Sequence, residues 1–307
     1  MSQAKQLGVI PSEAYAKQGF RAVDCGLNKI LTADILRQNH TPAALCSNDA
    51  KQCYDRIVHS VANICLQRIG IDENTCRVMF GSLQQMQHYV KTAYGISDNS
   101  YGCIEIPLQG VLQGNGAGPA IWLLTSIPII NMLRRQGFGF KSSNLLSDEK
   151  YHFACYTYVD DTDLIHNGDH NTTPTQAFDE MQRMLDHWEG GLRATGGALV
   201  PSKSYWYGID FKWNKQKHKW EYKKINELPG ALTLKDHSQT TIALTRLEVH
   251  EARETLGLWI AMDGNQTSQI EAIQTKIDTW ADKIRTKQLT KTEAWISLRV
   301  GVSKAIR

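Results

Sequence analysis

Three aspartates in two separated segments are the residues best suited to do chemistry. Asp160 and Asp161 are adjacent in YTYVDDTDLIH, residues 156–166, and Asp49 lies in SNDAKQCYD, residues 47–55. The β-branched and aromatic neighbours of the pair favour an extended strand interrupted by a tight turn. Two adjacent carboxylates in a shielded site repel each other by roughly a few kcal/mol unless a cation lies beside them. A divalent metal ion is the obvious candidate for that cation.

Asp49 strengthens the case for a metal site at Asp160 and Asp161. Two adjacent aspartates by themselves are more typical of a solvated acidic turn. Asp49 follows a short apolar strand, AALC, residues 43–46. If the two strands are neighbours, the carboxylates of Asp49, Asp160 and Asp161 converge. Short carboxylates are hard oxygen ligands that suit magnesium, with manganese as the substitute ion. The alternative role for Asp49 is a helix N-cap, because a helix is expected a few residues later.

A glycine-rich segment, LQGNGAGP, residues 112–119, lies between the two acidic segments. Its glycines allow the backbone to pass very close to a ligand, and Gln113 offers an amide beside Gly114. The alternative is a simple connector before a helix that begins at Pro119. The segment is not a phosphate-binding P-loop, because no G-K-[ST] sequence follows it.

Periodic apolar residues predict the elements that must hold these segments. A helix is expected over residues 19–38, a second after residue 57, a buried helix from Pro119 to about Gly137, and a fourth over the segment that contains Phe178, Met181, Leu185, Trp188 and Leu192. In the first helix the apolar face is predicted to comprise Val23, Leu27, Ile30, Leu31 and Ile35. Strands are expected between these helices. The order predicts an α+β fold in which helices cover one face of an antiparallel sheet.

The segment 204–225 is predicted to form a lysine-rich β-hairpin, because SYWYGIDFKW and KHKWEYKKI flank NKQK. Its mixture of tryptophan, tyrosine and lysine suits contacts with phosphates and stacking on bases. The same alternation describes an ordinary amphipathic hairpin with a buried aromatic side, and that alternative is favoured. A strand-like TLGLWIAMDGN, residues 255–265, precedes a last helix that begins near residue 267.

Composition excludes several classes of protein. With 42% apolar and 21% charged residues, the chain of 307 residues is not disordered, and its net charge of +3 is too small to indicate a polyanionic partner by itself. The seven cysteines include no C-x-x-C pair, which favours reduced thiols and an intracellular location, in the cytoplasm or nucleus. The longest apolar stretch, residues 119–133, is shorter than a bilayer span, and no signal peptide is visible, so no contact with a membrane is expected.

The segments DAKQCYD, LQGNGAGP and YVDD, in that order, resemble the three central motifs in the palm domain of reverse transcriptases, of a retroelement (retrotransposon) type. TGGALVPSKS, residues 195–204, resembles the next motif, and TLGLW, residues 255–259, resembles the turn of the primer grip. The resemblance runs from about residue 10 to about residue 300. It implies an RNA-directed DNA polymerase that uses an RNA template, a DNA or RNA primer and deoxynucleotides. It also implies a partial fingers segment (1–40), a palm with the catalytic motifs and the hairpin (41–265), and the truncated start of a thumb (266–307).

The resemblance implies a role for each acidic residue. Asp49 matches the first metal-binding aspartate and Asp160 the second, while Asp161 matches the last acid of the turn, which is also catalytic and metal-binding. In such a site two metal ions about 3.5–4 Å apart would make the 3′-oxygen nucleophilic and stabilise the pyrophosphate. The carboxylates of Asp49 and Asp160 are therefore expected to lie close together, at the ends of adjacent antiparallel strands.

Four further residues are implied to act on the substrate. Tyr54 matches an aromatic steric gate that excludes a 2′-hydroxyl, although a core tyrosine is the alternative. Gln113 and Gly114 match the loop that touches the nascent base pair. Lys203 matches a lysine that protonates the leaving pyrophosphate, with a plain surface lysine as the alternative. Such proton donors contribute roughly 10²–10⁴-fold to the rate.

Three other functions stay open. The first is a catalytically inactive retroelement remnant that binds nucleic acid or is only structural, because few residues before Asp49 are left for the fingers. The second is an RNA-dependent RNA polymerase, which Tyr54 argues against. The third is a metal-dependent phosphohydrolase, which leaves LQGNGAGP unexplained. No ribonuclease H, integrase or endonuclease segment is visible, so other polyprotein domains are expected to be missing.

Overall fold

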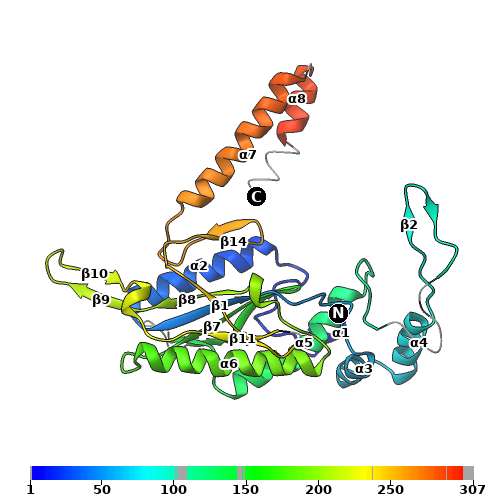
Figure 1. Ribbon diagram of the computed structural model, residues 1–307, viewed down its shortest axis with the longest axis horizontal. Helices are drawn as coiled ribbons and strands as arrows, with labels where there is room; N and C mark the ends of the chain where they lie inside the picture. Colours follow the sequence, from blue (N-terminus) through cyan, green and yellow to red (C-terminus); the bar gives the residue numbers. More distant parts are fainter. Residues whose placement is uncertain are drawn as a thin grey trace.

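The computed structural model of the chain describes residues 2–100, 102, 109–143, 147, 149–236, 238–287 and 289–299. Its centre is a five-stranded sheet in the order β13, β8, β1, β7, β6 (Figure 1). The strands comprise β1 (Ala43–Asn48), β6 (Cys155–Tyr158), β7 (Asp161–Asn167), β8 (Tyr205–Ile209) and β13 (Thr245–Leu247). The predicted α+β class is therefore found.

The sheet is mixed, so the prediction of a wholly antiparallel sheet was wrong. β1 pairs antiparallel with both β7 and β8, whereas β13 pairs parallel with β8. A parallel neighbour requires a long connection back to the same end of the sheet. The segment 210–244 provides that connection, and it contains the β9–β10 hairpin (Phe211–Asn214 and Lys219–Tyr222) and the β11–β12 pair (Thr233–Lys235 and Thr241–Ala243).

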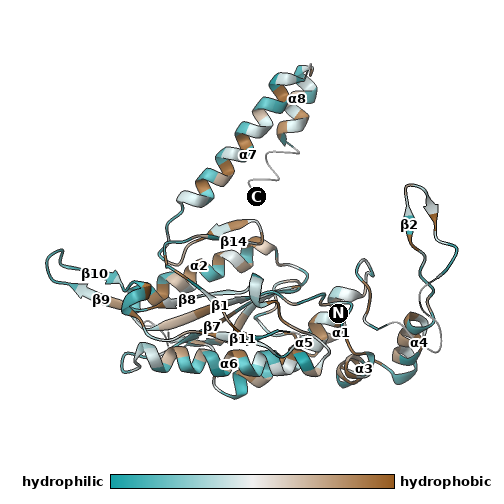
Figure 2. Ribbon diagram, viewed as in Figure 1, coloured by the Kyte–Doolittle hydropathy of each residue, from teal (hydrophilic) through white to brown (hydrophobic). Residues whose placement is uncertain are grey.

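Helices cover both faces of the sheet, which corrects the prediction of one covered face. In β1, Ala43 and Leu45 belong to the cluster that includes α2 (Ala22–Asn39), whereas Ala44 and Cys46 belong to the cluster that includes α5 (Gly118–Arg135) and α6 (Pro174–Ala194). Figure 1 accordingly shows α2 on one side of the sheet and α5 with α6 on the other. The reason is visible in the sequence AALC, which is apolar at every position and therefore buries both faces of the strand. Figure 2 shows the central strands largely brown, that is hydrophobic, as expected for strands covered by helices on both faces.

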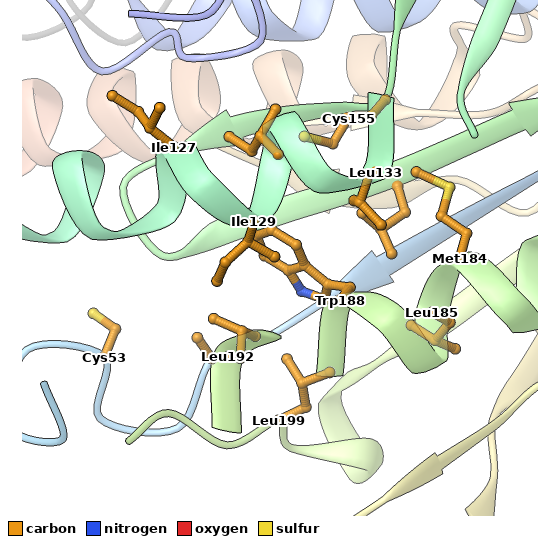
Figure 3. Close-up of a cluster of buried hydrophobic side chains, with 14 of the residues drawn as sticks. Cys53, Ile127, Ile129, Leu133, Cys155, Met184, Leu185, Trp188, Leu192 and Leu199 are labelled. Carbon is orange, nitrogen blue, oxygen red and sulfur yellow. The ribbon is translucent and has the colours of Figure 1, made fainter. Parts of the chain in front are cut away.

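The predicted face of α6 is confirmed. Phe178, Met181, Leu185, Trp188 and Leu192 are all buried. Thr173 caps the helix by accepting a hydrogen bond from the backbone N–H of Gln176. Figure 3 shows Trp188 reaching toward Ile129 of α5, so the two helices on this side of the sheet share one core.

The predicted face of α2 was wrong in part, since Ile30 and Ile35 are half-buried and pack against the core. Leu27 and Leu31 are 52% and 48% exposed. The fully buried residues are Cys25, Gly26, Lys29, Thr32, Ala33 and Leu36. Small side chains take this face because the β14–β15 hairpin (Arg253–Thr255 and Leu258–Ile260) packs on α2, and Lys29 is buried because it pairs with an aspartate of the sheet.

The remaining elements surround this core. They are α1 (Ser2–Gln6), α3 (His59–Arg68), α4 (Glu73–Gln84), the β2–β3 pair (Lys91–Thr92 and Gly95–Ile96) and the β4–β5 pair (Phe140–Ser143 and Lys150–Phe153). Two 3₁₀ turns span Pro201–Lys203 and Ile225–Glu227. Of the predicted 204–225 hairpin, only β9 and β10 pair with each other, because YWYGI joins the central sheet as β8. The sequence of residues 88–112 also predicts an extended segment with two turns, of which residues 101 and 103–108 lie outside the described residues.

The C-terminal segment forms two helices where one was expected. α7 (Thr267–Thr286) leads away from the sheet, and α8 (Lys291–Ser297) turns back so that Trp280 Nε1 donates to Ser297 Oγ over 2.9 Å (Figure 1). None of the helices in the described part of the chain is long and apolar enough to span a membrane. Six cysteines among the described residues are free thiols: Cys25, Cys46, Cys53, Cys65, Cys76 and Cys155.

Candidate catalytic site

The adjacent aspartates lie where β6 turns into β7. Tyr158 pairs with Asp161 across the hairpin, so Val159 and Asp160 form its two-residue turn. Val159 has φ +60°, a conformation that a β-branched residue rarely adopts. The indole Nε1–H of Trp122 in α5 donates to the carbonyl oxygen of Val159 over 2.6 Å. Strained backbone held by a neighbouring element is typical of functional sites, and sequence analysis missed both residues.

Asp49 lies at the same end of the neighbouring strand. The pairing of β1 and β7 ends where Asn48 faces Thr162, so Asp49, which follows Asn48, and Asp161, which precedes Thr162, lie at the same end of the two strands. The prediction that the two acidic segments end adjacent antiparallel strands therefore agrees with the structure. The N-cap alternative for Asp49 was wrong, because the N-cap of α3 is Val58.

The carboxylates share one electrostatic environment. Burial, followed by the negative charges of Asp160, Asp163 and Asp49, raises the pKa of Asp161 to about 6. The side chain of Asp161 is nevertheless exposed, so a ligand from solvent has access to it. Surplus negative charge at an accessible position is what a bound cation would relieve.

Lys203 lies beside Asp49. Its Nζ is 3.4 Å from Asp49 Oδ2. Backbone pairing brings the two segments together, since Val200 N donates to the carbonyl oxygen of Asp49 over 3.0 Å and Lys51 N donates to that of Ala198 over 2.8 Å. The Lys203 side chain is 68% exposed, so this ion pair contributes little to stability.

Tyr54 lies at the rim of the core, between the acids and the glycine-rich segment. Burial raises its pKa to about 12, and the charges of Cys53 and Asp160 act in the same direction. A Cβ built on Gly118 would be 3.5 Å from Tyr54 Cδ1, so the tyrosine ring touches the start of α5. Tyr54 is half-buried rather than fully enclosed, which leaves part of the side chain available to a ligand.

The glycine-rich segment is a largely exposed turn between Val111 and α5. Val111 N donates to the carbonyl oxygen of Tyr54 over 2.8 Å, and Asn115 Oδ1 accepts from Ala117 N over 3.0 Å. Gln113 and Gly114 are exposed, and nothing lies within 4 Å of the position that a Cβ on Gly114 would take. Their surface is therefore open to an approaching ligand. Pro119 lies in the first turn of α5, as predicted.

The donor atoms of the site fit magnesium by type. Asp49, Asp160 and Asp161 supply carboxylate oxygens, which hard divalent cations prefer. Within the described ranges, no group of three or more His, Cys, Asp or Glu side chains is arranged to hold a metal ion. The metal site therefore stays a prediction that rests on residue type, strand register and the raised pKa of Asp161.

Comparison with known proteins gives distant structural similarities. No protein-family model and no curated protein matches the chain. A structure of apo telomerase from Candida tropicalis covers 86% of this chain and 37% of its own, at 12% identity and a TM-score of 0.47. A structure of telomerase from Candida albicans in complex with the TWJ fragment of telomeric RNA covers 99% of this chain and 49% of its own, at 14% identity and a TM-score of 0.43. The chain thus spans less than half of each of these proteins. Similarities at these TM-scores carry no information about function, which must be inferred from the residues of the site.

Proposed function

We propose that this chain is the polymerase domain of a reverse transcriptase of retroelement type, which transfers nucleotides from dNTPs to a primer 3′-hydroxyl on an RNA template. The observation that carries the proposal is the register of β1 and β7, whose last pair, Asn48 and Thr162, brings Asp49 and Asp161 to the same end of neighbouring strands, beside the strained Val159–Asp160 turn. The order of DAKQCYD, LQGNGAGP and YVDD in the sequence supports it independently. The division into fingers (1–40), palm (41–265) and thumb (266–307) belongs to the same proposal.

Asp49, Asp160 and Asp161 would hold the magnesium ions, with manganese as a substitute. When bound, such ions make the 3′-oxygen a better nucleophile and stabilise the charge on the leaving pyrophosphate. The carboxylates do not need to act as general bases, because their role is to fix positive charge where negative charge develops.

The transfer forms one bond and breaks one. The primer 3′-oxygen attacks the α-phosphorus of the dNTP, and its proton passes to water. The bond between the α-phosphorus and the oxygen that bridges to the β-phosphorus breaks, and its electron pair leaves with pyrophosphate. Lys203 donates a proton to the pyrophosphate, a role that its ammonium group beside Asp49 suits.

Tyr54 and the exposed turn would select the nucleotide. The half-buried ring of Tyr54 stands between Asp160 and the start of α5, where it would clash with a 2′-hydroxyl. Gln113 and Gly114 would touch the nascent base pair, because both are exposed next to Tyr54. These features favour a DNA polymerase over an RNA polymerase. A phosphohydrolase has no evident use for the glycine-rich turn.

A second candidate is an inactive remnant that binds nucleic acid. In the part of the chain that the structure describes, the acids are not arranged as a three-ligand metal group, which favours this candidate. Primer extension separates the two, with RNA or DNA templates and with dNTPs or NTPs. We expect extension on RNA templates with dNTPs and magnesium. Salt-sensitive binding to primed RNA without extension would favour the remnant.

A further inference from the structure

Lys29 is a buried cation that connects its own helix to two other elements. It lies on α2 and is 2% exposed. Its Nζ donates to Asp163 Oδ2 on β7 over 2.8 Å and to Thr255 Oγ1 on β14 over 3.3 Å. Asp163 is two residues beyond Asp161 on the same strand, so its side chain is on the same face of β7. One ammonium group therefore joins the strand of the catalytic aspartates to the β14–β15 hairpin.

The Lys29–Asp163 pair is poorly explained by stability. A buried ion pair loses the hydration of both charges, and an apolar pair of similar volume is often at least as stable. The second carboxylate oxygen, Asp163 Oδ1, is also buried and has no hydrogen-bond partner among the described residues. The interaction instead fixes a position, because two acceptors, Asp163 Oδ2 and Thr255 Oγ1, determine where the ammonium group of Lys29 lies.

The hairpin is seated on α2 at a second point, three residues before Lys29. A Cβ on Gly26 would overlap Leu258 Cδ1, so the side chain of Leu258 lies directly against the helix at this glycine. Leu258 faces Thr255 across the hairpin. Leu256 and Gly257, with φ +54° and +82°, form the tight turn between them. Both members of the Thr255–Leu258 pair thus contact the same face of α2.

We propose that Lys29 is a positioning residue, which fixes the β14–β15 hairpin relative to the strand that carries Asp161. Its effect on nucleotidyl transfer rests on the proposed function. Lys29 touches no reacting atom and acts through Asp163, two residues from Asp161, and through Thr255. A displacement of about 1 Å in such a site lowers the rate roughly 10²-fold.

Two variants test the positioning without leaving a charge buried alone. Thr255→Val removes one acceptor and keeps the Lys29–Asp163 pair. Lys29→Met combined with Asp163→Leu removes both charges and keeps the volume apolar. Lys29→Met by itself would leave the Asp163 carboxylate unpaired and is expected to destabilise the whole fold. Thr241→Val, on the exposed strand β12, is the matched control.

The first readout needs no catalysis. Hydrogen exchange of the backbone amides in residues 253–260 should become about 10-fold faster in Thr255→Val and in the double variant, the effect of one hydrogen bond to a charged group. Amides of β8 should keep their rates in every variant, which separates a local effect from global unfolding. Unchanged exchange of residues 253–260 in both variants would overturn the proposal.

The second readout is kinetic. In primer extension, the double variant should lower kcat roughly 10- to 100-fold and leave KM for the dNTP unchanged, because alignment rather than binding is lost. A double variant with the kcat of the wild type would contradict the role in transfer. If the wild-type chain extends no primer, that result counts against the proposed function, and hydrogen exchange still decides the positioning role.

Discussion

Trp122 donates its indole N–H to the carbonyl oxygen of Val159, so the helix that follows the glycine-rich turn also holds the turn that carries Asp160. The two residues are 37 positions apart, and their hydrogen bond is 2.6 Å long. Through this contact the segments LQGNGAGP and YVDD are parts of one structural unit. The contact explains how a β-branched residue is kept at φ +60°.

Replacement of Trp122 by phenylalanine should lower the free energy of unfolding by about 1–3 kcal/mol, because the carbonyl of the half-buried Val159 loses its donor. Trp188→Phe is the matched control, since Trp188 Nε1 is buried and has no hydrogen-bond partner among the described residues. Both variants remove the same ring volume. Urea denaturation measures the difference, and equal losses in the two variants would show that the hydrogen bond is unimportant.

Asp161 should make stability depend on pH. Its pKa is raised to about 6 in the folded chain, so the folded state disfavours the ionised form. Stability contributed by the protonated carboxyl is therefore present at low pH and is lost as the pH rises from about 4 through about 6. Asp161→Asn should be more stable than the wild type by about 1 kcal/mol near pH 8, a value reduced because the side chain is exposed, and equal to it near pH 4.

The comparison of the wild type with Asp161→Asn is needed because His166 changes stability with pH in the opposite direction. Burial lowers the pKa of His166 to about 4, and its Nδ1 accepts from Gly139 N over 3.2 Å. Stability from this neutral imidazole is lost as the pH falls below about 6.5. The Asp161 contribution is thus the difference between two urea curves at each pH. A difference that does not change between pH 4 and pH 8 would contradict the assignment.

Gly110 should be far less tolerant than Gly114. A Cβ on Gly110 would lie 2.5 Å from the backbone of Asp55, and its φ is +77°. A Cβ on Gly114 meets no atom within 4 Å, although φ is +92° there. Gly110→Ala should therefore cost at least about 2 kcal/mol more than Gly114→Ala. Thermal denaturation of the two variants provides the comparison, and similar melting temperatures would be inconsistent with this packing.

Tyr54→Ala should relax the choice of sugar. Removal of the ring opens space between Asp160 and Gly118, so the ratio of ribonucleotide to deoxynucleotide incorporation should rise by at least about 10-fold. Tyr94→Ala serves as the control, because Tyr94 is 99% exposed on the β2–β3 hairpin. Single-nucleotide incorporation with paired dNTP and NTP substrates measures the ratio. An unchanged ratio would remove Tyr54 from the steric role.

Local patterns predicted the elements that depend on local packing. The buried face of α6, the start of α5 near Pro119 and the strand ends at Asp49 and Asp161 all agree with the sequence. Each follows from the spacing of apolar residues or from a terminator next to it. Lys203 was assigned to the site from the motif resemblance alone, and backbone pairing across residues 198–200 brings it beside Asp49.

Contacts between distant segments could not be predicted in this way. On α2, apolar spacing selected Leu27 and Leu31, but the face that the β14–β15 hairpin covers consists of small residues and Lys29. The charge of Lys29 can be buried because it pairs with Asp163, which is 134 positions away in the sequence. The parallel pairing of β13 with β8 likewise depends on the path of the segment that connects them, and the spacing of apolar residues does not determine that path.

The most direct measurement of the central claim is single-turnover addition of one dNMP to a primer annealed to RNA, in magnesium. The wild-type chain is compared with Asp160→Asn and with Asp169→Asn, a matched change in an exposed loop beyond β7. We predict addition by the wild type and by Asp169→Asn, and a loss of at least about 10³-fold in Asp160→Asn. Equal rates in the wild type and in Asp160→Asn, or no addition by the wild type, would contradict a catalytic role for the β6–β7 turn.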